Sequence, residues 1–375
     1  MSVKIFITGD VMPRMGHSEA FADASAEIFR EVKTFVSGAD IAITNLEAPI
    51  IKGIKTPIKK SGPNLYTNEI TIKSLKEIGF NIFTLANNHF FDQGQQGVES
   101  TLDACRHYGV EYVGGGKDIN EARKVLYKEA NGKCIAIINV CEHEFSIANT
   151  VHGGSNPLDL IHIQEDITSA RHKADYIVVI VHGGVEMFQL PTPRMKCWYR
   201  HFIDLGADTI LNHHQHCVNG YELYKGKPIF YGLGNFYFPR RKQKNRNDLW
   251  DYGYAVMLTI DNEVSFELIP YTQDINGIRL CDSVEFDNEI ERLNHIITDD
   301  DLLQQEFDEF VIKGETNIML NFIPSFLRNR IFDAIIRKVW GGRIYKDKQL
   351  YSLKNLLTCE SHHERIQKLF NKMTS

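Results

Sequence analysis

Residues 209–216 read TILNHHQH, a short apolar run that passes directly into three histidines within four positions. The run is rich in β-forming residues and follows a helical pattern, so it predicts a strand that ends at the histidines. Because His214 and His216 alternate, their two imidazoles can reach neighbouring metal ions. The stretch therefore predicts a strand that delivers metal ligands at its carboxyl end.

The same arrangement recurs earlier in the chain. Predicted strands at 3–8, 41–44, 81–86 and 176–181 each run into a polar side chain of ligand type. The candidate ligands at strand ends are Asp10, Glu47, Asn88, His182, His214 and His216. In α/β folds, sites form in the crevice beyond the carboxyl ends of strands, so these residues are expected to converge. A mixed oxygen and nitrogen set suits Mn, Zn or Fe rather than Ca.

Each candidate alone also has an ordinary structural interpretation. Asp10 follows a glycine and can serve as a turn or helix-cap residue. Glu47 alone is typical of a surface carboxylate, and Asn88 beside Asn87 is typical of a turn. His182, on an apolar strand, fits a buried core histidine. The position that these residues share at strand ends favours one joint site.

Helical and strand patterns alternate through the first half of the chain. A helix is expected at 24–36, where apolar residues form a stripe and Gly38 stops it, and another at 158–173. Residues 220–233 and 252–270 then predict hairpins. This order predicts an α/β fold in which sheet layers are flanked by helices.

Two later segments carry no obvious chemistry. From about residue 283 the pattern is helical and charged, so we expect one domain over 1–280 and a helical C-terminal extension over 281–375. Residues 239–249 hold five arginines and lysines. A solvated or disordered loop is the expected structure there, since blocks of like charge tend to be disordered. The alternative is a mobile lid over an anionic substrate.

Composition excludes several classes of protein. The 375 residues are 43% hydrophobic and 24% charged, which predicts an ordinary buried core. A net charge of -6 argues against a nucleic-acid partner. The seven cysteines form no Cys-x-x-Cys pair and fit reduced thiols. No apolar stretch reaches a membrane-spanning length, and the N-terminal apolar run is too short for a signal peptide. We therefore expect a cytoplasmic protein.

Six motifs occur in an order typical of one family. They are GDVM at 9–12, TNLE at 44–47, LANNHFFDQG at 85–94, VHGGVE at 181–186, HHQH at 213–216 and YGLGNF at 231–236. Together they resemble the poly-gamma-glutamate capsule biosynthesis (CapA) family, within the calcineurin-like metallophosphoesterase superfamily. The resemblance covers about residues 3–270. Phosphoesterases of the broader superfamily carry Asp-x-His in the first motif and bridge their metals with Asp. Met12 and Glu47 stand at those positions here and are typical of the capsule family.

The resemblance implies a four-layer αββα sandwich with a two-metal site. It implies that Asp10 and His216 hold one ion, that Glu47 bridges both ions, and that the remaining ligands hold the second. Those remaining ligands are Asn88, His182 and His214. It further implies catalytic roles for His89, which would protonate the leaving group or stabilise the transition state, and for Asp92, which would hydrogen-bond a histidine and set its tautomer.

Three functions follow as expectations. The first is a metal-dependent hydrolase linked to poly-gamma-glutamate, capsule or cell-envelope polymer biosynthesis, acting on an anionic small molecule or polymer, with a polymer-synthesis complex as a further expected partner. The second is an intracellular phosphodiesterase or nucleotidase. The third is a non-catalytic scaffold in a polymer-synthesis complex, which would tolerate the loss of His89.

Overall fold

Two mixed β-sheets form the centre of the protein. The computed structural model describes residues 2–13, 15–240, 249–261, 263–281 and 283–320, together with Leu353, Leu357 and Phe370. In order across the first sheet lie β16 (Gly277–Leu280), β15 (Val264–Asp274), β14 (Tyr252–Ile260), β1 (Val3–Val11), β2 (Ile41–Leu46), β3 (Ile82–Thr84) and β4 (Glu111–Val113), and β13 (Asn235–Tyr237) pairs with the end of β1. In order across the second lie β11 (Tyr221–Tyr224), β12 (Lys227–Phe230), β10 (Thr209–His213), β9 (Tyr176–His182), β7 (Lys133–Cys141) and β6 (Leu126–Ala130). A small ladder joins β5 (Gly115–Gly116) to β8 (Gly154–Ser155).

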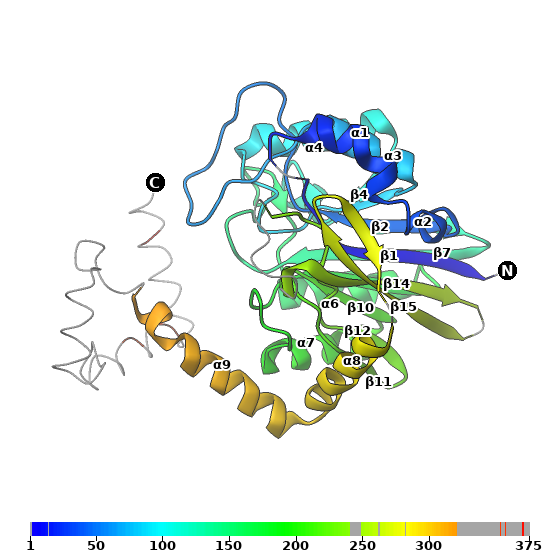
Figure 1. Ribbon diagram of the computed structural model, residues 1–375, viewed down its shortest axis with the longest axis vertical. Coiled ribbons are helices and arrows are strands. Elements are labelled where there is room, and N and C mark those ends of the chain that lie inside the picture. The colour runs from blue at the N-terminus through cyan, green and yellow to red at the C-terminus, as the bar shows by residue number, and fades with distance from the viewer. Residues whose placement is uncertain are drawn as a thin grey trace. The chain divides into compact units, whose positions relative to one another are not determined.

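Helices alternate with the strands along the chain and follow the last of them. Those before β4 are α1 (Ser18–Ile28), α2 (Lys33–Ser37), α3 (Glu69–Ile78) and α4 (Gly94–Tyr108). Those after it are α5 (Ile119–Ala122), α6 (Leu160–Arg171), α7 (Pro193–Leu205), the 3-10 turn η1 (Leu249–Asp251), α8 (Ser283–Thr298) and α9 (Asp300–Leu320). Figure 1 shows α1, α3 and α4 on one side of the first sheet, and α7 beyond the second sheet on the opposite side. This arrangement confirms the predicted α/β sandwich with a helical C-terminal region.

Strand β1, near the middle of the first sheet, is buried on both faces. In β1 every residue except Lys4 is buried. Phe6 packs into an apolar cluster with Phe29, Phe80 and Phe236, where the ring centroids lie 5.6–6.5 Å apart along the contacts Phe6–Phe80, Phe29–Phe236 and Phe80–Phe236. Burial on both faces explains why β1 is almost continuously apolar until Gly9 and Asp10.

Capping residues define several helix starts. Asn68 accepts a hydrogen bond from the backbone N–H of Ile70 at 3.0 Å, and α3 begins one residue after it. Thr192 accepts from the N–H of Met195 at 3.2 Å, with Pro193 as the first residue of α7. Such caps satisfy backbone N–H groups that have no partner within the helix, so they define the residue at which each helix begins.

The single helix predicted at 24–36 is wrong, because the chain turns between α1 and α2. The apolar positions were identified correctly, since Phe29 and Val32 are fully buried within the turn. The far end of the first sheet packs against this turn: the Leu280 N–H donates to Glu31 Oε2 at 2.8 Å, and a Cβ on Gly277 would lie 2.9 Å from the Ile28 carbonyl oxygen. A tertiary contact therefore overrides the local helical pattern.

The chain divides into two compact units, Met1–Phe307 and Asp308–Ser375. Helix α8 packs within the first: Asn294 Oδ1 accepts from the Tyr221 N–H at 2.6 Å, and the Lys196 ammonium donates to the Ile297 carbonyl. The predicted domain division at 280 stays a prediction, and most of 321–375 lies outside the described residues. So do residues 241–248, on which the expected loop or lid falls.

Two further findings bear on the sequence predictions. The six cysteines that the structure describes are all free thiols. Among the described ranges, no helix combines the length and the apolarity that crossing a bilayer requires.

Candidate metal centre

The carboxyl ends of strands from both sheets meet at one place. Strands β1 and β2 run parallel in the first sheet with Asp10 opposite Asn45, and β9 and β10 run parallel in the second with His182 opposite His213. Asn45 connects the two, because its Nδ2 donates to Asp10 Oδ1 at 2.7 Å and lies 3.5 Å from His182 Nδ1. Parallel pairing therefore delivers the strand-end side chains of both sheets to a shared crevice.

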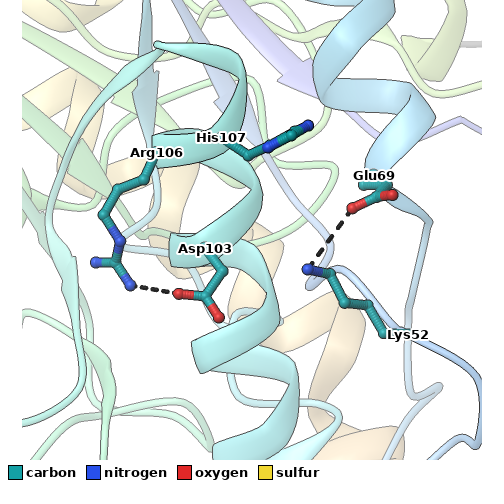
Figure 2. Close-up of a pocket in the computed structure, with 5 residues that line it drawn as sticks. All are labelled: Lys52, Glu69, Asp103, Arg106 and His107. Atoms are coloured by element: carbon teal, nitrogen blue, oxygen red, sulfur yellow. Dashed lines mark hydrogen bonds and ion pairs between the residues drawn. The ribbon is translucent and has the colours of Figure 1, made fainter.

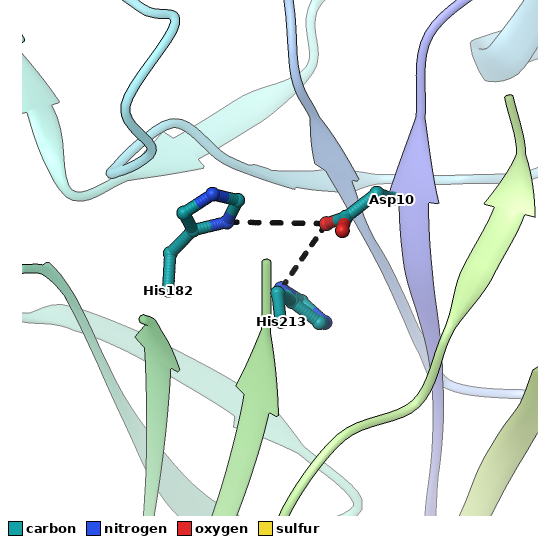
Figure 3. A group of neighbouring side chains, drawn as sticks. All are labelled: Asp10, His182 and His213. Carbon is teal, nitrogen blue, oxygen red and sulfur yellow. Dashed lines mark ion pairs between the residues drawn. The ribbon is translucent and has the colours of Figure 1, made fainter. Parts of the chain in front are cut away.

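Figure 3 shows the Asp10 carboxylate facing the rings of His182 and His213. Asp10 Oδ1 lies 3.9 Å from His182 Nδ1 and 4.0 Å from His213 Nδ1. All three side chains are at most 1% exposed. His213 was not among the predicted ligands, although it directly precedes the predicted ligand His214.

Glu47 lies at the centre of two further groups. Its Oε1 is 3.8 Å from His182 Nε2 and 3.8 Å from His216 Nε2. In the group Glu47, His182 and His214, and in the group Asp10, Glu47 and His216, one ligand atom from each residue lies within 4.8 Å of the others. Five of the six predicted ligands are therefore adjacent in space.

The Glu47 carboxylate is fully buried, and neither of its oxygens makes a hydrogen bond to any described residue. Burial, followed by the negative charge of Asp10, raises the pKa of the Glu47 carboxyl well above its ordinary value. A buried carboxylate without partners is unfavourable unless it is protonated or a cation neutralises it. A buried carboxylate with two free oxygens, one of which lies 3.8 Å from both His182 Nε2 and His216 Nε2, fits a divalent metal.

The histidines are in the form that binds metals. Burial, and then the neighbouring imidazole of His214, lowers the pKa of His182 well below its ordinary value. Burial also lowers the pKa of His213 and of His216. Neutral imidazoles with a free ring nitrogen bind transition metals, whereas protonated ones do not.

His216 is held with one defined nitrogen toward the site. Its Nδ1 donates to Asn235 Oδ1 at 2.8 Å, and the Asn235 amide is itself oriented by donating to the carbonyls of His216 and Trp250. Nε2 therefore carries no proton and faces Glu47. The ring also packs against Trp250 and Phe238, with centroids 4.5 and 5.5 Å away.

The backbone around the histidines is strained. His214 has a φ of 88° and His216 a φ of 56°, in the left-handed region that residues with a Cβ rarely adopt. The His214 N–H donates to Asp10 Oδ2 at 3.2 Å, which ties the turn to the opposite sheet. Strain of this kind is concentrated at functional sites, where surrounding contacts hold it in place.

Asn88 completes the predicted set. Its Oδ1 lies 3.0 Å from His182 Nε2, and its Nδ2 donates to Glu144 Oε2 at 3.0 Å. Glu144 was not predicted, although it follows the end of strand β7 just as the predicted ligands follow theirs. The rule of ligands at strand ends could have found it.

Next to Asn88, His89 and Asp92 form a buried pair. His89 Nδ1 donates to Asp92 Oδ2 at 2.6 Å, and that oxygen also accepts from the Leu65 N–H at 2.6 Å. Lys60 forms an ion pair with Asp92 Oδ1, and its Nζ lies 3.2 Å from His89 Nδ1. Lys60 was not among the predicted site residues. Because a carboxylate only accepts, Nδ1 carries a proton, and Nε2 is the ring nitrogen that does not face Asp92.

An open depression elsewhere on the molecule lacks these properties. Figure 2 shows Lys52, Glu69, Asp103, Arg106 and His107 around it. Lys52 Nζ lies 3.7 Å from Glu69 and Arg106 donates to Asp103 at 2.6 Å, so its acids and bases neutralise one another. The strand-end crevice, with its unpartnered buried carboxylate, is the candidate site.

The fold and the site together define a class. The chain is an α/β sandwich whose clustered Asp, Glu and His side chains are compatible with binding a divalent metal. Comparison with known families gives the narrower assignment. The family described as "Bacterial capsule synthesis protein PGA_cap" matches residues 4–240, and the chain belongs to this family.

Two curated relatives agree with this assignment. The chain is 32% identical over 244 residues to the "Capsule biosynthesis protein CapA" of Bacillus anthracis, across 61% of this chain and 59% of that protein. It is 33% identical over 226 residues to the "PGA biosynthesis protein CapA" of Bacillus subtilis strain 168, across 59% of each. The matched part thus spans about three fifths of the length of these relatives.

A similar solved structure is that of a hypothetical protein from Thermus thermophilus. It shares 15% sequence identity with a TM-score of 0.45, over 72% of this chain and 99% of that one.

Proposed function

We propose that this chain is a metal-dependent hydrolase with a two-metal centre, acting in the biosynthesis of poly-gamma-glutamate capsule or a related cell-envelope polymer. The observation that carries the proposal is the fully buried Glu47 carboxylate, whose two oxygens have no hydrogen-bond partner among the described residues and whose Oε1 lies 3.8 Å from a ring nitrogen of His182 and of His216. Glu47 would bridge the two ions. Asp10 and His216 would hold one, and Asn88, His182 and His214 would hold the other.

Two divalent Mn, Zn or Fe ions, when bound, would supply an activated water and stabilise developing negative charge. The chain's own residues supply the remaining chemistry. Asp92 holds a proton on His89 Nδ1, and a second proton carried on Nε2 is the one that His89 donates to the leaving group. Lys60 lies against both and forms an ion pair with the Asp92 carboxylate.

The substrate belongs to the same proposal. An anionic small molecule or polymer fits a centre of divalent cations. The two relatives named CapA connect the family with capsule synthesis. A cytoplasmic location and membership of a polymer-synthesis complex complete this proposal.

A second candidate is an intracellular phosphoesterase unrelated to any capsule, which the metallophosphoesterase-like sandwich favours. Metal-loaded protein should be assayed on phosphodiesters, nucleoside monophosphates and gamma-glutamyl oligopeptides. Turnover of the peptides supports the polymer role, and turnover of the phosphoesters alone supports the second candidate.

The same assay tests whether the chain is an enzyme. We expect His89→Asn to keep its metal content and melting temperature while losing about 10²–10⁴-fold in turnover. His107→Asn, an exposed histidine in the remote depression, serves as the matched control and should retain full activity. Wild-type turnover by His89→Asn would remove His89 from the mechanism, and loss of metal would make it a ligand. A metal-loaded wild type that cleaves nothing would favour the scaffold.

A further inference from the structure

One carboxylate outside the proposed ligand set contacts two of its members. Glu144 Oε2 accepts a hydrogen bond from Asn88 Nδ2 at 3.0 Å, and Glu144 Oε1 lies 3.6 Å from His214 Nε2. The Glu144 side chain is 38% exposed, so it lies at the rim of the crevice while both of its partners are buried.

The contact with Asn88 determines which end of the amide faces the site. A carboxylate only accepts hydrogen bonds, so the Asn88 NH₂ must point toward Glu144. The side-chain oxygen Oδ1 of Asn88 then points away from Glu144 and lies 3.0 Å from His182 Nε2. An amide turned by 180° would bring two oxygens together and direct the NH₂ at the position of a cation.

The contact with His214 acts on the ring in the same way. Its Nε2 faces the Glu144 carboxylate, which favours a proton on that nitrogen. The other nitrogen, Nδ1, lies 3.2 Å from His182 Nε2 and is left without a proton. Asn88 Oδ1 and His214 Nδ1 thus both present free lone pairs beside His182 Nε2.

The segment that carries Glu144 is fastened to the turn that carries Asn88. The Ser146 hydroxyl donates to the backbone carbonyl of Asn88 at 2.7 Å and accepts from the backbone N–H of Phe91 at 3.0 Å. Ser146 is fully buried. These two hydrogen bonds hold Glu144 beside the ligands, although it lies 56 positions from Asn88 in the chain.

We propose that Glu144 is a positioning residue that orients Asn88 and His214 for the second metal ion. This role rests on the proposed metal centre. Replacing Glu144 with Gln supplies an NH₂ group, which can face His214 Nε2 only if that nitrogen loses its proton. The proton then moves to Nδ1 and blocks the nitrogen that would bind the metal.

The test is calorimetric titration of chelator-stripped, full-length protein with Zn²⁺. Loss of such outer-shell partners typically lowers metal affinity about 10–100-fold. We expect Glu144→Gln to weaken the second binding step by that factor and to leave the first step and the melting temperature unchanged. Equal affinity in wild type and variant, or equal weakening of both steps, would overturn the role.

Glu186→Gln is the matched control. Glu186 is exposed, and its charge contributes to raising the pKa of Glu47, after burial and Asp10. Its removal therefore takes away a nearby negative charge without disturbing the contacts to Asn88 and His214. We expect a change of less than about fivefold, as for an exposed charge. If Glu186→Gln weakens the second step as much as Glu144→Gln does, net charge explains the effect and the positioning role fails.

A second measurement needs no variant. Nitrogen–proton correlation spectra of the metal-free wild-type protein report which nitrogen of His214 carries the proton. We expect the proton on Nε2, and a neutral ring with the proton on Nδ1 would contradict the proposal. A wild-type protein that binds no Zn²⁺ in the titration would instead overturn the metal centre itself, whatever the tautomer.

Discussion

At the scale of single residues, the decisive feature is a carboxylate with no partner among the residues that the structure describes. Most buried polar groups in folded proteins are hydrogen-bonded, so an exception calls for an explanation. Glu47 is such an exception, and Asp10 nearby adds a second negative charge. Histidines held neutral by burial cannot neutralise this charge by themselves. A bound divalent ion would.

The first prediction concerns that residue. Glu47→Gln keeps the size of the side chain and removes the charge that both ions would share. We expect metal content to fall while the fold persists, because the side chain lies at the end of a strand in a preformed sheet. Elemental analysis and circular dichroism of the purified variant check both parts. Unchanged metal content would show that Glu47 is not a ligand.

The second prediction concerns the buried pair Lys60 and Asp92, whose side chains are 2% and 0% exposed. Removing one member of a buried pair leaves an uncompensated charge and lowers stability by about 3–5 kcal/mol. We expect that loss for Lys60→Met in denaturant unfolding. The neighbouring, exposed Lys59→Met should change the free energy of unfolding by less than about 0.5 kcal/mol. Similar values for the two variants would contradict the proposed pair.

The candidate ligands were predictable because strand ends can be recognised in the sequence, and parallel strands present their ends at one edge. Their orienting partners were not. Asn235 lies 19 positions from His216, and Glu144 lies 56 positions from Asn88. Neither contact follows from local periodicity, because it depends on how two sheets are brought together. Asn45 and Asn235 lie within the motifs at 44–47 and 231–236, but nothing in these motifs indicates what the side-chain amides contact.

At the scale of elements, the site depends on close approach between β1 and the segment before β13. A Cβ on Gly9 would lie 1.8 Å from the Gly234 carbonyl oxygen, so only glycine permits this approach. Gly9 directly precedes Asp10, and β13 pairs with β1 at that residue. The glycine therefore determines where the first proposed ligand lies.

The third prediction follows from that contact. In Gly9→Ala the backbones of two strands must separate, since no flexible side chain can give way. We expect a loss of about 3 kcal/mol or more in the free energy of unfolding, together with weaker metal binding. Thermal melting and metal titration check the two effects. A variant with wild-type stability would show that the approach is looser than the structure indicates.

The predicted helix at 24–36 illustrates the limit of pattern analysis at this scale. Its apolar positions are buried, but the contact that accompanies the turn comes from Leu280, 249 positions away from Glu31. Periodicity identifies which side chains are buried. It does not reveal a strand that arrives from the other end of the domain.

At the scale of the whole molecule, alternating helices and strands followed by hairpins were enough to predict sheet layers flanked by helices, and the family resemblance implied the sandwich. The order of the motifs was enough to predict the family, which matches residues 4–240. The relative places of Lys60, Glu144 and Asn235 required the assembled structure. The central claim concerns the assembled site, because no single segment of the chain contains more than two of the six proposed ligands.

The most direct test of that claim is the metal content of the full-length protein, purified without chelator and measured by elemental analysis before and after incubation with Mn²⁺ or Zn²⁺. We expect about two transition-metal ions per chain, as in two-metal hydrolytic sites. We also expect the Glu47→Gln variant, treated in parallel, to retain fewer ions. A wild-type protein that holds no transition metal, even after incubation, would contradict the proposed metal centre.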